Sequence, residues 1–185
     1  MSAAPQVRRT DKLMSEHEMD AFLSHGYCGH LSTVGADEWP YVCPMLYVWR
    51  DRQVWLHNTS ATGHLRSNVV HDSRACFEVA SAGTVFAYGR YECDTGIEYQ
   101  SVITFGRIAI ANDRGQKAQF FDALMAKYYP NDSTRPRGFY PRLDDVTVYA
   151  LAVERMTGKK TALPAEQARW PAVDNTKSPH AKPPL

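Results

Sequence analysis

The order of apolar segments along the chain constrains its fold more than any single motif. Six or seven strand-like segments follow one another almost continuously, and only two or three helical segments interrupt them. A doubly wound sheet needs a helix at nearly every crossover between parallel strands, so this order favours antiparallel pairing. The sequence therefore predicts a mainly β protein, an antiparallel barrel with a few helices.

Turn and cap signals place the individual elements. Ser15 and Glu18 have the spacing of a capping box, ahead of a helix that ends at Gly26. The longest strand is expected to bend near Gly106, where a glycine interrupts its apolar pattern. Periodicity predicts strands at residues 30–34, 39–49, 53–57, 75–79, 99–111 and 146–154, and further helices at 62–71 and 116–129.

Length and charge narrow the functional classes. The 185 residues suffice for one domain with a sizeable core. The formal net charge is +1 and the basic residues are scattered, which argues against nucleic acid or an anionic membrane as partner. No apolar run approaches about 20 residues, and the N-terminus lacks the apolar core of a signal peptide, so we expect a cytoplasmic protein.

The domain organisation follows from composition. We expect an N-terminal arm over residues 1–12, a single domain over residues 13–160 and a tail over residues 161–185. The tail holds five of the eleven prolines in the chain. Two interpretations of it stand: a disordered segment, or one extended over a partner subunit with Trp170 as its anchor.

The four cysteines contain no CxxC pair. We expect free thiols, buried at Cys28, Cys43 and Cys76, where the neighbouring residues are apolar or strand-like. A zinc site that combines cysteines with some of the seven histidines is a minor alternative, because no two ligands lie close together in the sequence. The sequence therefore predicts no metal.

Residues 54–66 read as a strand, a hydroxyl-rich turn and the start of a helix. The turn holds Thr59, Ser60 and Thr62, and the helix carries His64 and Arg66. Free amides at a helix N-terminus, hydroxyl groups and a guanidinium together can bind a phosphate dianion, helped by the helix dipole. The same small polar residues also cap ordinary helices, so these residues alone leave both interpretations open.

Three segments, in order, resemble one family. They are YCGHLSTV at 27–34 followed by PYVCPMLYV at 40–48, WLHNTSATGHLR at 55–66, and YQSVITFGR at 99–107, preceded by Cys93. The chain in this respect resembles the FMN-binding split-barrel proteins related to pyridoxamine 5'-phosphate oxidase. Within them it is most similar to the nitroimidazole-resistance (Nim) and flavin-nucleotide-binding proteins, and the resemblance covers residues 8–159.

The resemblance implies a six-stranded antiparallel split β-barrel that forms a homodimer, with two FMN molecules in the groove between the subunits. It implies that the flavin ring lies against Pro44, Met45, Leu46, Tyr47, Leu56 and His57. It implies that the ribityl chain and the phosphate are bound by Asn58, Thr59, Ser60, Thr62, His64 and Arg66.

Ser101 corresponds to a polar strand residue that in the family often reaches the ring from the other subunit. Simpler roles are open for some of these side chains: Met45, Leu46 and Leu56 could be barrel core, and Ser101 could be a strand hydroxyl that faces water.

Two positions depart from the family pattern. Many relatives have Lys or Arg where this chain has Gly63, and Arg where it has Gln100. Each missing charged hydrogen bond is expected to weaken phosphate binding by about 1.5 to 3 kcal/mol. His64 and Arg66 are the residues that can replace these cations.

The function that the resemblance implies is a flavin-dependent oxidoreductase that reduces a small molecule, such as a nitroimidazole, another nitroaromatic compound or a quinone. His57 is the candidate catalytic residue, because an imidazole at the strand end could exchange the proton that accompanies hydride transfer. The alternatives are a non-catalytic protein that binds or stores flavin, or haem through a histidine, and a deazaflavin-dependent reductase on the same fold.

Overall fold

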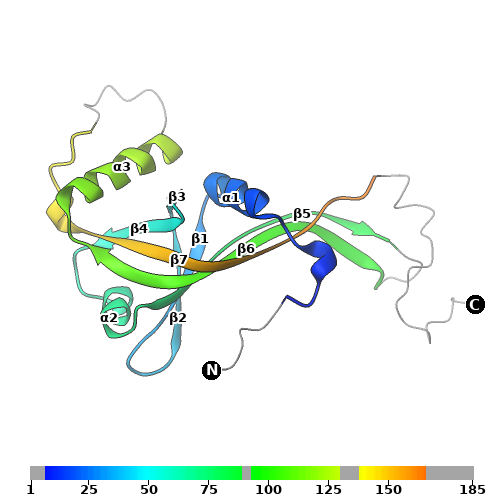
Figure 1. The fold of residues 1–185 in the computed structure, drawn as a ribbon, viewed down its shortest axis with the longest axis horizontal. Helices are drawn as coiled ribbons and strands as arrows, with labels where there is room; N and C mark the ends of the chain where they lie inside the picture. Colours follow the sequence, from blue (N-terminus) through cyan, green and yellow to red (C-terminus); the bar gives the residue numbers. More distant parts are fainter. Residues whose placement is uncertain (1–6, 89–92, 130–137, 166–185) are drawn as a thin grey trace, which may run out of the picture.

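The computed structural model describes residues 7–88, 93–129 and 138–165. Within this part, seven strands form one antiparallel sheet in the order β2-β1-β5-β6-β7-β4-β3, accompanied by three α-helices (Figure 1). The strands are β1 Gly29–Val34, β2 Pro40–Met45, β3 Val48–Arg50, β4 Gln53–Thr59, β5 Arg74–Ala87, β6 Thr95–Ala111 and β7 Val146–Thr161. The helices are α1 Glu16–His25, α2 His64–His71 and α3 Arg114–Tyr128, with the short 3-10 helices η1 Thr10–Lys12 and η2 Leu143–Asp145.

The two edges of the sheet are consecutive in the chain. Only Leu46 and Tyr47 separate β2 from β3, so a short covalent link joins the first and last strands of the sheet. The prediction of one uninterrupted strand over 39–49 was therefore wrong. The interruption occurs where Tyr47 turns inward: its side chain is fully buried, and its hydroxyl donates to the carbonyl oxygen of Leu23 at 2.5 Å. The antiparallel split barrel is confirmed, with one of its six expected strands in two pieces.

Two local features shape the barrel strands. β3 and β4 are joined by Asp51 and Arg52, both with positive φ (53° and 56°), as a two-residue hairpin turn requires. The pairing of β6 with β7 shifts between Phe105 and Gly106, which confirms the irregularity expected at that glycine. A Cβ atom at Gly106 would lie 1.9 Å from the carbonyl oxygen of Ala152, so this close approach of two strands requires glycine.

The apolar side chains form two clusters on opposite sides of the sheet. The larger one fills the barrel and includes Leu31, Leu56 and Phe77. The smaller one lies under α3, where Phe120 and Leu124 pack against side chains of β3, β4 and β7. Because residues alternate between the two faces of a strand, β4 contributes Val54 and Leu56 to the first cluster and Trp55 to the second.

Beyond the barrel, β5 and β6 continue together as a long ribbon, here called the arm (residues 80–87 and 95–101) (Figure 1). The arm was missed: the expected strand at 75–79 is in fact Arg74–Ala87. The last strand is also longer than expected, because β7 continues to Thr161 beside the base of the arm. Near the tip, Val85 and Ile97 face each other across the two strands and are 62% and 40% exposed.

The N-terminal segment lies along the outer edge of β7. Leu13 forms a bridge with Lys159, and the amide of Met14 donates to the carbonyl oxygen of Gly158 at 3.0 Å. The capping box at Ser15 and Glu18 is confirmed, with both reciprocal hydrogen bonds present, and α1 ends at Gly26 as expected. These contacts fasten α1 beside the base of the arm.

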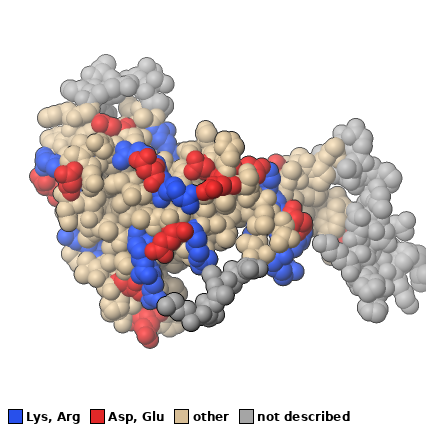
Figure 2. Space-filling model, in the orientation of Figure 1, with Lys and Arg blue, Asp and Glu red and all other residues tan. Residues whose placement is uncertain are grey.

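The surface carries both signs of charge. On the face drawn in Figure 2, acidic and basic side chains are interspersed over the barrel. None of the described helices is long and apolar enough to cross a membrane. All four cysteines are free, but Cys28 and Cys93 are exposed, so the expectation of a buried thiol at Cys28 was wrong; Cys43 and Cys76 are half-buried.

Candidate functional site

The turn between β4 and α2 presents unused donors. Its residues Thr59, Ser60 and Thr62 are exposed, and their hydroxyl groups have no hydrogen-bond partner among the described residues. The helix begins at His64, two residues later than expected, and its N-cap Gly63 provides no side-chain cap. The simpler interpretation, in which the hydroxyl groups serve only to cap the helix, is therefore not realised. The first amides of α2 stay free for an external acceptor.

Other polar groups hold this turn in place. Arg66 donates to the carbonyl oxygen of Ser60 at 2.5 Å, so its guanidinium lies over the turn. The amide of Ser60 donates to the carbonyl oxygen of Asp145, which removes one amide from the set available to a ligand. Asn58 accepts from the phenol of Tyr149 at 3.1 Å, and burial raises the pKa of that phenol. Asn58 therefore has a structural partner in the described protein, whereas Arg66 has further donors to offer.

His64 connects the turn to β2. Its ring lies 5.3 Å from the ring of Tyr41, centroid to centroid, at a tilt of 35°. His64 is exposed at the first position of α2, so its imidazole lies beside the free amides. A Cβ atom at the adjacent Gly63 would meet no atom within 4 Å, which shows that the space in front of the helix is open.

The predicted contacts of the flavin ring are divided between surface and core. Residues 44–47 among them are here called the ring-binding strip. Pro44 is exposed, Leu46 is 39% exposed, and Met45 is half-buried against the barrel cluster. Tyr47 and Leu56 are fully buried. The alternative role as core is thus correct for the side chain of Leu56. Tyr47 offers a ligand no side chain, and its amide and carbonyl oxygen already contact the phenol of Tyr128.

His57 lies on the outer face of β4, beneath α3. Its ring is 5.5 Å from Phe120 and 5.1 Å from Phe121. The Nδ1 atom is buried without a hydrogen-bond partner, and burial lowers the pKa of the imidazole from its usual value of 6.5. His57 is therefore neutral at pH 7, and only Nε2 is placed to exchange a proton with a bound molecule.

Ser101 lies far from the turn along the sheet. It pairs with Ala80 of β5 and Lys159 of β7 at the base of the arm, and it is half-buried. By the pairing register it shares a sheet face with Pro44, because Pro44, His30, Glu78 and Ile103 form one cross-strand row and Ser101 stands two residues from Ile103. One copy of the chain does not bring Ser101 and Arg66 together.

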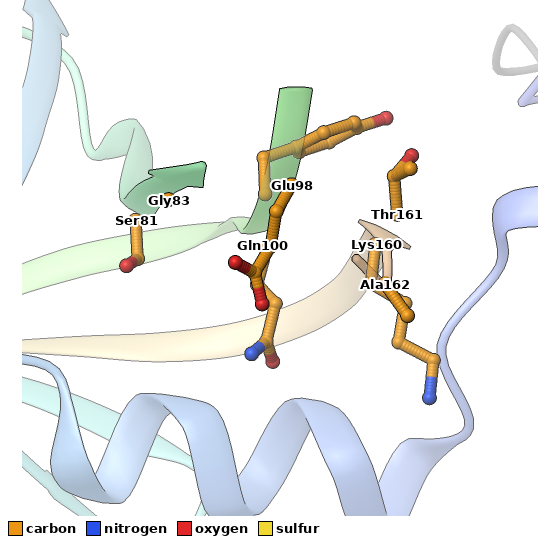
Figure 3. A pocket seen from close by; sticks show the side chains of 8 residues that line it. Ser81, Gly83, Glu98, Gln100, Lys160, Thr161 and Ala162 are labelled. Atoms are coloured by element: carbon orange, nitrogen blue, oxygen red, sulfur yellow. The ribbon is translucent and has the colours of Figure 1, made fainter. Parts of the chain in front are cut away.

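Gln100 lines a cavity of about 420 Å³ on the other face of the arm (Figure 3). Lys160 stands opposite Gln100 in the pairing of β6 with β7, and both side chains point to the side of α1 in Figure 3. The ammonium of Lys160 is bound by Glu18, and this ion pair holds the pKa of Glu18 at about 2. Lys160 therefore does not supply an uncompensated charge in place of the cation that Gln100 lacks. The cavity is lined by Ser81, Gly83, Glu98, Tyr99, Gln100, Lys160, Thr161 and Ala162.

Two residues of α3 that sequence reasoning did not select lie against the ring-binding strip. The phenol of Tyr128 contacts the backbone of Tyr47, and the ammonium of Lys127 lies 3.8 Å from the centroid of the Tyr47 ring. The spacing of Lys127 in the sequence could have identified it as unusual. It stands seven residues after Phe120 and three after Leu124, on the apolar stripe of the helix. A lysine in such a stripe breaks the pattern.

These residues fit the phosphate group of a flavin nucleotide. The uncapped end of α2, the free hydroxyl groups and the guanidinium of Arg66 form a donor set suited to phosphate. Among the residues described, no three His, Cys, Asp or Glu side chains gather as metal ligands would. The donor set thus suits an anionic organic cofactor.

Comparisons with solved structures show the same fold. The flavocytochrome Anf3 from Azotobacter vinelandii is 19% identical, with a TM-score of 0.73 over 97% of this chain and 90% of that one. An FAD and haem binding protein from Mycobacterium smegmatis is 20% identical, with a TM-score of 0.70 over 85% and 78%. A candidate 5-nitroimidazole antibiotic resistance protein from Bacteroides thetaiotaomicron is 17% identical, with a TM-score of 0.67 over 80% and 85%.

The comparison with curated proteins finds no match. A family model described as pyridoxamine 5'-phosphate oxidase matches residues 15–160, which include the turn, the arm and all of the strands except the last residue of β7. The chain therefore belongs to the pyridoxamine 5'-phosphate oxidase family, a family of flavin-binding proteins.

Proposed function

We propose that the protein binds FMN and uses it to reduce a small oxidised molecule, of the nitroaromatic or quinone class. The observation that carries the proposal is the open, uncapped start of α2, with three unpartnered hydroxyl groups before it and Arg66 over it. The flavin, when bound, supplies the storage of two electrons. The residues of this chain hold the phosphate, form the strip for the ring and exclude water from it.

His57 is the proposed proton-exchanging residue. Its neutral imidazole can accept a proton at Nε2 near neutral pH. The position under Phe120 and Phe121 also suits a purely structural role. A His57→Ala variant that binds FMN normally and reduces a nitroaromatic compound at the unchanged rate would exclude the catalytic role.

The first test is a titration of the protein with FMN, followed by quenching of the flavin fluorescence. We expect saturation near one FMN per chain, and an affinity at least about tenfold lower for Arg66→Ala, since a charged hydrogen bond is lost. Arg74→Ala is the matched control, because Arg74 is exposed, follows α2 closely and pairs with Asp72. Loss of affinity in both variants, or no saturable binding by the unmodified protein, would contradict the proposal. FAD titrated in parallel distinguishes the two flavins.

We also propose that two copies of the chain complete each site, with Arg66 from one and Ser101 from the other. The distance between these residues along the sheet of one copy, and the exposed apolar pair Val85 and Ile97 on the arm, support this arrangement. Mixed dimers of Arg66→Ala with Ser101→Trp provide the test. A shared site restores one intact site per mixed dimer, about one quarter of an FMN per chain after random exchange; sites within single copies restore none.

Haem binding in place of flavin is a second candidate function. Two of the solved structures with the same fold are described as a flavocytochrome and as an FAD and haem binding protein. This chain offers the exposed imidazole of His64 as an iron ligand. A Soret band after addition of haemin, abolished by His64→Ala and kept by His71→Ala, is the expected result; a spectrum of free haemin would exclude this function.

A further inference from the structure

The ammonium of Lys127 occupies an unusual place. Its Nζ atom is buried and has no hydrogen-bond partner, and within the described part of the chain Lys127 forms no ion pair. It lies 3.8 Å from the ring centroid of Tyr47 and 5.3 Å from that of Tyr128. Aromatic faces attract a cation, but they do not replace the hydrogen bonds that water gives an ammonium group.

This burial has a cost that an apolar residue would avoid. Desolvation lowers the pKa of Lys127 to about 8, so the side chain is still mostly protonated at pH 7. Phe120 and Leu124 occupy the preceding positions of the same stripe, where leucine or methionine would also fit at 127. Packing alone does not explain the charge.

The position of this cation is fixed relative to the ring-binding strip. Tyr128, the next residue, binds the amide of Tyr47 at 3.2 Å and lies 3.0 Å from its carbonyl oxygen. Tyr47 is the last residue of the strip Pro44–Tyr47 and sits at the link that closes the barrel. The Lys127 charge is therefore held at one end of the strip, in a medium where charges interact more strongly than in water.

We propose that Lys127 is a positioning residue for the electrostatics of flavin reduction, and that its ammonium stabilises the negative charge which the flavin gains. The inference rests on the proposed flavin site. A flavin bound there, on taking up two electrons (from dithionite in the test below) and one proton at N5, would carry one additional negative charge, on its pyrimidine side. Lys127 then favours the reduced form over the oxidised one, whereas Arg66 interacts with a phosphate whose charge is the same in both.

The test compares the affinities for oxidised FMN, in air, and for FMN reduced with dithionite under nitrogen. In Lys127→Met the dissociation constant for oxidised FMN divided by that for reduced FMN should fall about tenfold relative to the unmodified protein, because a partly buried positive charge that favours the reduced form is removed. Tenfold corresponds to a potential about 30 mV lower for this two-electron couple. Lys127→Arg should keep the ratio, and Lys127→Gln repeats the loss with a polar side chain.

Lys117→Met is the matched control, because Lys117 is half-buried on the same helix and lies ten residues, or about 15 Å, away along its axis. An unchanged ratio of the two dissociation constants in Lys117→Met, together with a lowered ratio in Lys127→Met, supports the proposal. FMN binding with equal ratios in all variants overturns this inference alone. No binding of either flavin form by the unmodified protein overturns the proposed function and the inference together.

Discussion

The phenol of Tyr128 contacts both backbone polar groups of Tyr47. The Tyr47 amide donates to it at 3.2 Å, and the Tyr47 carbonyl oxygen lies 3.0 Å away. The same phenol lies 2.6 Å from the carbonyl oxygen of Tyr27, just before β1. One hydroxyl group of α3 thereby connects the Leu46–Tyr47 link to the segment just before β1. At this link the sheet edges β2 and β3 are not paired with each other, so the hydroxyl group helps to hold the barrel together.

Tyr128→Phe should lower the free energy of unfolding by about 1 to 3 kcal/mol, because the amide of Tyr47 loses its acceptor in a partly buried place. Urea unfolding followed by circular dichroism measures the change. Tyr129→Phe is the control, since Tyr129 is exposed and its phenol has no hydrogen bond among the described residues. Equal stability of both variants would show that the Tyr128 contacts contribute nothing net.

Gly63→Arg should raise the affinity for FMN by roughly tenfold, or about 1.5 kcal/mol, through one added charged hydrogen bond. Gly63 has a φ of −129°, which other residues adopt, and a side chain there would start in open space. Gly63→Gln controls for the loss of glycine. Riboflavin, which lacks the phosphate, should gain no affinity; an equal gain for riboflavin would place the added charge elsewhere than at a phosphate.

The Lys127 ammonium should make stability depend on pH in the alkaline range. Its folded pKa of about 8 lies below the usual 10.5, so between these values the unfolded chain binds more protons and stability rises with pH. The destabilisation is complete below pH 8, at about 1 to 2 kcal/mol once partial solvent exposure is allowed for. Lys127→Met should remove this rise in urea unfolding between pH 7.5 and about 10, whereas Lys117→Met should keep it.

His57 should make the protein less stable in mild acid. Its folded pKa lies below 6.5 because of burial, so below about pH 6.5 the unfolded chain takes up a proton that the folded chain does not. The slope of stability against pH from this one group is at most about 1.4 kcal/mol per pH unit. His57→Phe should flatten the curve of unfolding free energy against pH between about pH 6.5 and 5; a curve as steep as that of the unmodified protein would contradict the prediction.

The elements that local signals specify were predicted correctly. The capping box of Ser15 and Glu18 needs only residues three apart, and Leu65 and Val69 of α2 are buried as their spacing indicates. The antiparallel order followed from the number of strands relative to helices. These predictions depend on interactions within one turn or one hairpin, which a short stretch of sequence contains.

The errors arose where distant parts of the chain decide the structure. Residues 39–49 have no break in their apolar pattern, and the interruption at Tyr47 depends on Leu23 of α1 and Tyr128 of α3. The segment around Ser81 and Gly83 lies beyond the expected strand at 75–79, yet it is strand because β6 lies beside it. The surroundings of His57 come from Phe120 and Phe121, more than sixty residues later.

The interrupted strand also affects how the protein resists aggregation. An edge strand with free amides can recruit a strand from another molecule and start aggregation. In this sheet one edge, β3, has only three residues, and the other, β2, carries Pro40 and Pro44, which have no amide hydrogen to donate. The seam between β2 and β3 is thus a poor template for amyloid-like growth.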